Sequence, residues 1–178
     1  WVAACKLLNK WPELLKVTHR GKYADNYSNL PFFADATLRI RALAETGSLE
    51  EAIALHKKAY NALPKHMRSS LLLKPELGAA LFALAGRPND VSLVSAFLKS
   101  KSQKEFWSAT ALMAAGEREG ISRMQRIAEQ SPDAFIRRSA QERLSNPPQP
   151  PELSSDAIDH LDRLKSDIKN SQSMEASS

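Results

Sequence analysis

The stretch from Gly47 to Pro64 constrains the fold most, because it combines a helix end, a tight turn and a second helix. Gly47 adopts a positive φ angle without steric cost, so it suits the position just after a helix. We predict that Ser48 is the N-cap of the second helix, and that Glu51, three residues later, completes a capping box with it. Apolar residues follow at helical spacing until Pro64, which ends the helix. Two helices joined by so short a turn pack antiparallel, so this stretch predicts a helical hairpin.

This hairpin resembles the second half of a tetratricopeptide repeat, in which Gly, Ala, Ala and Pro recur in a fixed order. The matching residues here are Gly47, Ala52, Ala59 and Pro64. The resemblance implies a stack of helical hairpins in which small side chains let neighbouring helices approach closely. Before Gly47 the pattern departs from the family, since Ala36 and Ile40 stand where it often has Trp and Gly. A pair of antiparallel helices in a non-repeat bundle is the alternative.

Two later glycines, Gly86 and Gly116, also follow apolar helical patterns and predict helix ends. They lie 39 and 30 residues after the preceding helix-ending glycine, which is about the length of a helical hairpin. Ile121 stands where the pattern needs a small residue, so the last copy is degenerate. The predicted structural repeat positions are Gly47, Ala52, Ala59, Pro64, Gly86, Gly116 and Ala128. We expect three hairpins with end helices, forming a right-handed helical-hairpin solenoid of tetratricopeptide type.

Further helix starts are predicted from residues that cap helices or favour their first turn. They are Asn89 or Asp90, the capping box Ser102 with Glu105, and Ser131 followed by Pro132. The whole chain reads as helical, because aromatic residues make up 7% of it, glycines number 6, and no alternating β pattern competes. These features predict an all-α fold.

The C-terminal part differs from the rest of the chain. Residues 1–146 form the predicted repeat domain, and a Pro-rich run over 147–153 predicts a stiff, extended linker. A tail helix over 154–170 follows, and the polar residues 171–178 predict a disordered end. The tail has an apolar seam at spacings of four, three and four, namely Ala157, Leu161, Leu164 and Ile168. Such a seam docks either in cis or on a partner.

The sequence contains no recognisable active site, so we expect no catalytic, cofactor-binding or metal-binding residue in this segment. No nucleophile elbow, phosphate-binding loop or dinucleotide fingerprint is present. The four histidines, which are His19, His56, His66 and His160, lack metal-ligand spacing. Asp156, Asp159 and Asp162 lie three apart and read as a solvated helix face. Cys5 is the only cysteine, so no disulfide framework is possible. We therefore expect Cys5 to be a core residue and the protein to be located in a reducing compartment, the cytoplasm.

Charge is distributed unevenly between the two parts. Residues 1–146 hold 22 Lys and Arg against 14 Asp and Glu, net +8, whereas residues 147–178 hold 3 against 6, net −3. The candidate partner-binding basic surface consists of Lys57, Lys58, Arg68, Lys101, Lys104, Arg137 and Arg138. Such a surface would also suit RNA. However, no aromatic side chains that could stack on bases lie among these basic residues. Phe106 and Trp107 are neighbours on one predicted helix, so at least one of them must face the core.

A second resemblance concerns two segments of the chain. Leu30 to Ala52 and Phe106 to Leu144 are similar to the soluble helical extension that follows the membrane domain of some bacterial rhomboid-type proteins. The apolar first residues, Trp1 to Cys5, would fit a chain cut just after a membrane span. The resemblance implies a cytoplasmic extension of an intramembrane serine protease, whose catalytic Ser and His motifs are not in these residues. No apolar run here approaches the roughly 20 residues of a span.

Together these features predict a protein–protein interaction module, an adaptor or scaffold that binds a peptide or helix on a helical-repeat surface. The first alternative is the regulatory extension of a rhomboid-type protease, tethered to the membrane through residues before Trp1. The second alternative is RNA binding through the basic face. The partner's identity does not follow from the sequence.

Overall fold

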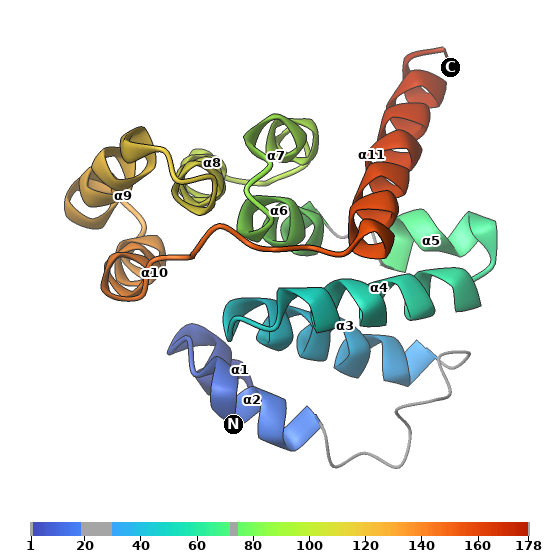
Figure 1. Cartoon of the computed structure of the whole chain (residues 1–178), viewed down its shortest axis with the longest axis horizontal. Helices are drawn as coiled ribbons and strands as arrows, with labels where there is room; N and C mark the ends of the chain where they lie inside the picture. The colour runs from blue at the N-terminus through green and yellow to red at the C-terminus, as the bar shows by residue number, and fades with distance from the viewer. Residues whose placement is uncertain (1, 19–29, 72–74, 178) are drawn as a thin grey trace. The chain divides into compact units, whose positions relative to one another are not determined.

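A computed structural model describes residues 2–18, 30–71 and 75–177, and within these ranges every regular element is an α-helix (Figure 1). The prediction of an all-α fold is confirmed. The chain divides into two compact units, Trp1–Leu77 and Gly78–Ser178, which we call the first unit and the second unit. The predicted boundary at residue 146 does not coincide with this division.

The first unit is built from five described helices. They are α1 (Val2–Leu7), α2 (Trp11–Thr18), α3 (Leu30–Glu45), α4 (Leu49–Ala62) and α5 (Lys65–Leu71). α3 packs against both α2 and α4, and α1 packs on α2. One apolar cluster joins Cys5, Trp11, Leu14 and Ala42, so the single cysteine is a core residue as predicted.

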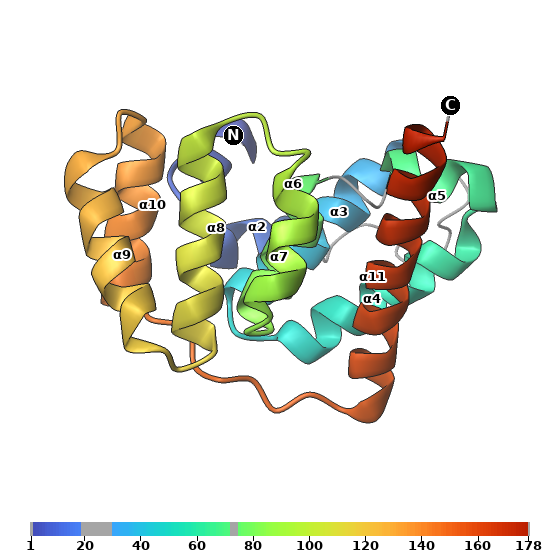
Figure 2. The same ribbon diagram turned by 90° about the horizontal axis from the view of Figure 1, so that it is seen from above.

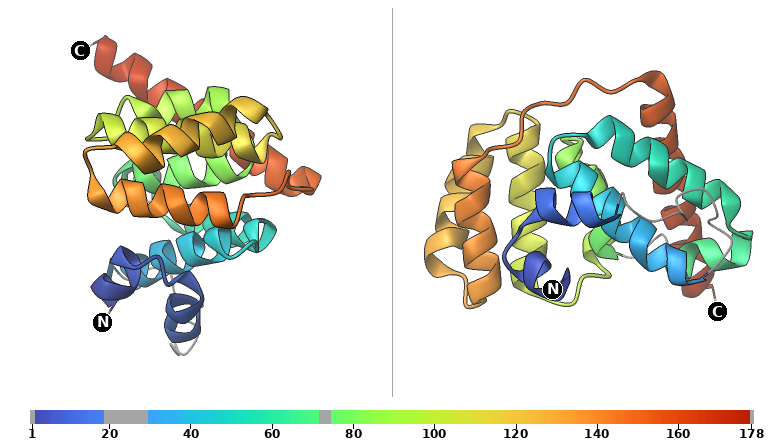
Figure 3. Two further views of the ribbon diagram at one scale, coloured as in Figure 1. Left: turned by 90° about the vertical axis from the view of Figure 1, so that its left-hand side faces the viewer. Right: turned by 90° about the horizontal axis from the view of Figure 1, so that it is seen from below.

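The second unit begins within a helix and contains the longest helix of the described chain. Its helices are α6 (Pro75–Leu84), α7 (Pro88–Ser95), α8 (Lys101–Ala114), α9 (Arg118–Gln130), α10 (Ala134–Ser145) and α11 (Ser155–Ala176). α8, α9 and α10 pack against one another and lie side by side in Figures 2 and 3. α7 packs on α8, and α11 packs on α7. The segment between α10 and α11 forms no helix.

Three hairpins share one turn geometry, in which a glycine with positive φ follows the first helix. The φ angles are 88°, 70° and 79° at Gly47, Gly86 and Gly116. In each turn the residue after the glycine donates its backbone N–H to the carbonyl five residues earlier, as in a Schellman motif. The donor and acceptor pairs are Ser48 with Leu43, Arg87 with Phe82, and Glu117 with Leu112. The next helix then begins two residues after the glycine.

The remaining repeat positions lie on or beside the helices of these hairpins. Ala52 and Ala59 are fully buried on α4, and Pro64 follows the Leu63 C-cap of that helix. Ala128 is half-buried on α9. The small residues of α4 therefore lie on a buried side of that helix.

Gly120 is a helical glycine that allows two helices to touch through their backbones. A Cβ atom added there would lie 2.4 Å from the backbone nitrogen of Met113 and 2.9 Å from the carbonyl carbon of Leu112. Real Cβ atoms do not approach so closely. The first turn of α9 therefore packs directly on the last turn of α8, and a side chain at residue 120 has no room.

The predicted N-cap position is confirmed at Ser48, and the predicted caps are corrected at three other helix starts. Ser48 is the N-cap of α4, but its side chain accepts no capping hydrogen bond. The side chain of Ser100 caps α8, so Ser102 lies inside that helix. Asp133 caps α10 by accepting from the backbone N–H groups of Phe135 and Ile136, so the prediction at Ser131 is wrong.

At α7 the helix starts at Pro88 with Arg87 as N-cap, rather than after Asn89 or Asp90. Proline at the first helical position has a preset φ angle and no N–H to satisfy, and it starts the helix early. As a result, Asp90 lies within the first turn of α7 and its carboxylate is free to accept from the Arg87 side chain.

The tail helix extends further than predicted. α11 runs to Ala176 rather than to residue 170, and takes in most of the end predicted to be disordered. The Ser171, Ser173 and Ser177 hydroxyls donate to carbonyls four residues earlier, which satisfies these polar side chains along the helix. The predicted apolar seam is confirmed, because its four residues are all buried. Of the helices described here, none has the length and apolar content needed to cross a bilayer.

Candidate functional site

The contact between α11 and α7 brings together residues that lie more than seventy positions apart in the chain. Arg87 donates to Asp162, Lys165 pairs with Asp90, and the Gln172 amide donates to the Leu93 carbonyl at 3.1 Å. Residue numbers rise together on both helices, so α11 runs parallel to α7, as Figure 2 also shows. We call Arg87, Asp90, Asp162 and Lys165 the ion-pair cluster.

Arg87 is the centre of the ion-pair cluster because its guanidinium serves two carboxylates. Its Nε atom donates to Asp90 on α7, and its Nη2 atom donates to Asp162 on α11. Partial burial disfavours the charged guanidinium, but the hydrogen bonds and charges of Asp162 and Asp90 outweigh this effect and raise the pKa of Arg87. Arg87 therefore remains a cation that bridges the two helices.

Asp90 is the buried member of the ion-pair cluster, with a side chain only 5% exposed. Its Oδ2 atom accepts from Arg87, while its Oδ1 atom lies 3.0 Å from Lys165 Nζ. A buried carboxylate is costly unless it is paired. By contrast, Asp162 is 57% exposed and its pair is accessible to water. Within the cluster Asp90 is thus buried, Arg87 is partly buried, and Asp162 lies at the rim.

The apolar seam of α11 is the buried face of that helix. Leu161 and Leu164 are almost completely buried, and Ile168 is buried nearly as well. Burial of these three side chains stabilises docked α11 by roughly 5–9 kcal/mol before the cost of ordering the chain is subtracted. Because helices in proteins are held mainly by packing of their apolar faces, the helical state of α11 depends on this docking.

The segment that carries the chain from α10 to α11 leads back toward the start of the second unit. Residues 147–154 lie outside any helix, and their full extension spans about 26 Å. This length is enough to pass about three neighbouring helices, because the axes of packed helices lie 8–10 Å apart. Pro150 passes the α8–α9 turn, where its Cγ atom lies 3.9 Å from a Cβ built on Gly116. The chain thus returns to α7 instead of adding a further helix beyond α10.

The predicted basic surface is divided between the two units. Lys57, Lys58 and Arg68 belong to the first unit, and Lys101, Lys104, Arg137 and Arg138 belong to the second. Arg68 donates to the Leu63 carbonyl and lies over the Tyr60 ring, and Arg137 donates to the Ser131 carbonyl. These two side chains are used inside their own units. Lys101, Lys104 and Arg138 are exposed.

The aromatic pair on α8 is entirely internal. Phe106 and Trp107 are both buried, whereas the sequence required only one of them to be core. The guanidinium of Arg143 on α10 lies over both rings, at 5.5 Å and 5.9 Å from their centroids. Neither ring is available to stack on a base.

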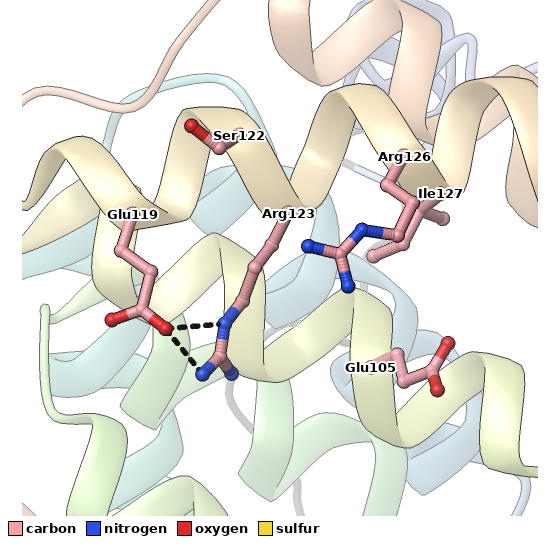
Figure 4. A pocket seen from close by; sticks show the side chains of 6 residues that line it. All are labelled: Glu105, Glu119, Ser122, Arg123, Arg126 and Ile127. Carbon is pink, nitrogen blue, oxygen red and sulfur yellow. Dashed lines mark hydrogen bonds and ion pairs between the residues drawn. The ribbon is translucent and has the colours of Figure 1, made fainter.

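A surface pocket of about 330 Å³ lies between α8 and α9 (Figure 4). Its lining residues are Glu105, Glu119, Ser122, Arg123, Arg126 and Ile127. Arg123 is paired with Glu119 across one turn of α9. Two carboxylates and two guanidinium groups balance in charge.

The histidines that the structure describes do not converge. His56 is buried beside Tyr60 on α4, His160 is buried on α11, and His66 is exposed on α5, while His19 lies outside the described residues. In the described part of the chain, no three His, Cys, Asp or Glu residues are grouped so that they could hold a metal ion.

Sequence reasoning missed the ion-pair cluster. It assigned Asp162 to a solvated face and did not single out Arg87, Lys165 or Gln172. A signal was present, because Asp162 and Lys165 directly follow the seam residues Leu161 and Leu164. Charged residues at the edge of an apolar seam commonly select the partner of a helix.

Comparison with protein-family models, with curated proteins and with solved structures yields no match to this chain.

Proposed function

We propose that this chain is a protein–protein interaction module that binds an amphipathic helix on the surface of a helical-hairpin array. The observation that carries the proposal is the α7–α11 contact, in which the second unit already binds a helix. That contact holds two ion pairs and one amide–carbonyl hydrogen bond, and α11 has a buried apolar seam beside its charged residues. Interaction modules that recognise helices use the same combination.

The architecture that we propose for this function is a right-handed solenoid of tetratricopeptide type. Its support is the shared Schellman turn of the three hairpins and the buried alanines of α4. A reducing, cytoplasmic location suits a chain whose single cysteine is a buried core residue.

The full chain can be tested against a displayed library of amphipathic-helix and extended peptides, at about 0.1 M and about 0.5 M salt. We expect helical peptides to be selected, and their Kd to rise only a few-fold at the higher salt, because apolar contacts resist screening. Reversing two exposed charges, Lys101→Glu with Lys104→Glu, should leave this binding unchanged, since neither residue lies in the α7–α11 contact.

The two rival functions predict other results. RNA binding predicts that single-stranded oligonucleotides bind with a steep salt dependence and that the Lys101→Glu, Lys104→Glu variant loses this binding. A regulatory extension of a membrane protease predicts that the library yields no ligand for the full chain or for any variant in which α11 is undocked, and that the encoded residues before Trp1 form apolar spans. Either result would contradict the proposed function.

A further inference from the structure

We infer that α7 presents a preformed helix-binding face that α11 occupies in cis, and that the partner is a helix with the same apolar and charge pattern as α11. This inference rests on the proposed function and names the chemistry of its partner. In this arrangement α11 acts as a built-in competitor, so the face becomes available when α11 is displaced.

The pattern required of the partner follows from the contacts of α11. The buried seam of α11 consists of the small or branched apolar residues Ala157, Leu161, Leu164 and Ile168, and we give the partner helix the same spacing. An acidic residue follows the second seam position, where Asp162 meets Arg87. A lysine follows the third seam position, where Lys165 meets Asp90. The partner helix therefore reads Leu-Asp-x-Leu-Lys at its centre and lies parallel to α7.

The receiving half of this contact does not need α11 in order to be organised. Arg87 and Asp90 pair with each other across the first turn of α7, so the buried carboxylate keeps a cation when α11 leaves. The charges that recognise the partner are thus held in place by α7 itself. Preorganised charges of this kind lower the cost of binding a new helix.

The attachment of α11 fits a displaceable element. Its buried residues end at Ile168, and the last turns of the helix carry no buried side chain, with Met174 75% exposed. A linker without regular structure connects α11 to α10, so the helix can leave without breaking the packing of α8, α9 and α10. A short linker gives a tethered helix an effective concentration in the millimolar range, which hides the face from weak competitors.

The test uses the full chain and a labelled synthetic peptide of residues 155–176, followed by fluorescence anisotropy. An opened variant carries Leu161→Asp with Leu164→Asp, which removes the seam of α11 but leaves α7 intact. The matched control carries Ile158→Asp, on the exposed face of α11. We expect the opened variant to bind the peptide at least ~10-fold more tightly than the natural chain and the control.

Two peptides of identical composition test the charge pattern on the opened variant. One exchanges the contacting residues, Asp162→Lys with Lys165→Asp, and the other exchanges the exposed residues Asp159→Lys with Lys169→Asp. We expect the first peptide to bind at least ~10-fold more weakly than the natural peptide, and the second to bind equally well. Equal weakening by both exchanges would overturn the charge pattern.

A second, milder variant keeps the test valid if the opened variant misfolds. Asp162→Arg with Lys165→Glu changes only rim side chains and should also open the face. If both variants keep the helix content of α8–α10 and neither binds the peptide better than the natural chain, the inference is wrong. The proposed function would then still be decided by the library, because its peptides need not resemble α11. No library ligand for any variant would instead overturn the proposed function.

Discussion

Arg87 shows at the residue scale how one side chain can couple two helices. Its planar guanidinium donates through Nε to Asp90 on α7 and through Nη2 to Asp162 on α11. The N-cap position of Arg87, set by Pro88, turns the side chain toward Asp90. A local feature of the α6–α7 turn thus determines where α11 docks.

The first prediction compares three substitutions in the ion-pair cluster. Arg87→Ala leaves Asp90 buried with only Lys165 to balance it, and we expect the free energy of unfolding of the second unit to fall by about 3 kcal/mol. Arg87→Lys supplies one nitrogen for two carboxylates. We expect its free energy of unfolding to be intermediate between those of Arg87→Ala and the natural chain. Asp162→Ala should cost less than about 1 kcal/mol, because Asp162 is largely exposed.

Urea denaturation of the three variants measures these differences. A loss for Asp162→Ala as large as that for Arg87→Ala would show that the exposed half of the cluster dominates, contrary to the burial of Asp90.

The second prediction concerns pH. The pKa of Arg87 is raised in the folded chain, so its contribution to stability is complete below its ordinary pKa and is lost only when the pH rises through the raised value. Asp90 and Asp162 accept from the guanidinium and Lys165 pairs with Asp90, and pH values from about 7 to about 9 lie well below the ordinary pKa of an arginine. Hydrogen-exchange protection of α11, corrected for the intrinsic rate, should therefore be constant over this range. A fall in protection would implicate a different titrating group.

The third prediction uses Gly120, where α9 touches the backbone of α8. Gly120→Ala would normally favour a helix, yet here the new methyl group meets backbone atoms of Leu112 and Met113 that cannot move aside. We expect a loss of about 1–3 kcal/mol in the free energy of unfolding. Ser122→Ala, on the exposed face of the same helix, is the matched control and should change stability by less than about 0.5 kcal/mol. Equal values for both variants would contradict the close approach.

At the scale of the helix, α11 is the element whose order depends most on one contact. The fourth prediction is that Leu164→Ala increases hydrogen exchange throughout Ser155–Ala176, because the seam supplies most of the docking energy. Ile158→Ala removes a similar side chain from the exposed face and should leave exchange unchanged. Faster exchange in α8–α10 as well would show that α11 belongs to the core of the second unit.

Helix pairing could be predicted from the sequence because glycine has a conformational role that few residues share. The three glycines assigned to helix ends all have positive φ angles, and the seam of α11 is buried as its spacing predicts. The caps could not be predicted as well, because several serines and aspartates near each helix start compete for one position. Ser100 and Ser102 differ only in which one precedes the first helical turn.

The candidate site was less predictable than the fold. Asp162 resembles its neighbours Asp156 and Asp159 in sequence, and only the path of the linker back to α7 distinguishes it. That path depends on packing between residues far apart in the chain, such as Pro150 beside Gly116. The extension of α11 beyond residue 170 is not predictable from the sequence, because no apolar repeat continues there. It is stabilised instead by serine hydroxyls that donate to carbonyls four residues earlier and by the Gln172 amide, which donates to the Leu93 carbonyl.

For the molecule as a whole, the chain divides into two compact units. The fifth prediction is that Ile40→Ala accelerates hydrogen exchange in the first unit but not in the second, and that Met124→Ala does the reverse. Both side chains are fully buried, Ile40 belongs to the first unit and Met124 to the second, and each substitution should cost about 2–5 kcal/mol. Equal acceleration in both units would show that the chain unfolds as one cooperative body.

The parallel course of α7 and α11 has a mechanical consequence. A force that pulls on the carboxyl end reaches Gln172 first, then Lys165 and finally Asp162, so it breaks the contacts one after another instead of loading them together. Once the last contact opens, the linker straightens and takes up slack before any strain enters α10. Tension at the end of the chain would thus peel α11 away while the rest of the second unit remains folded, which makes α11 a low-force release element.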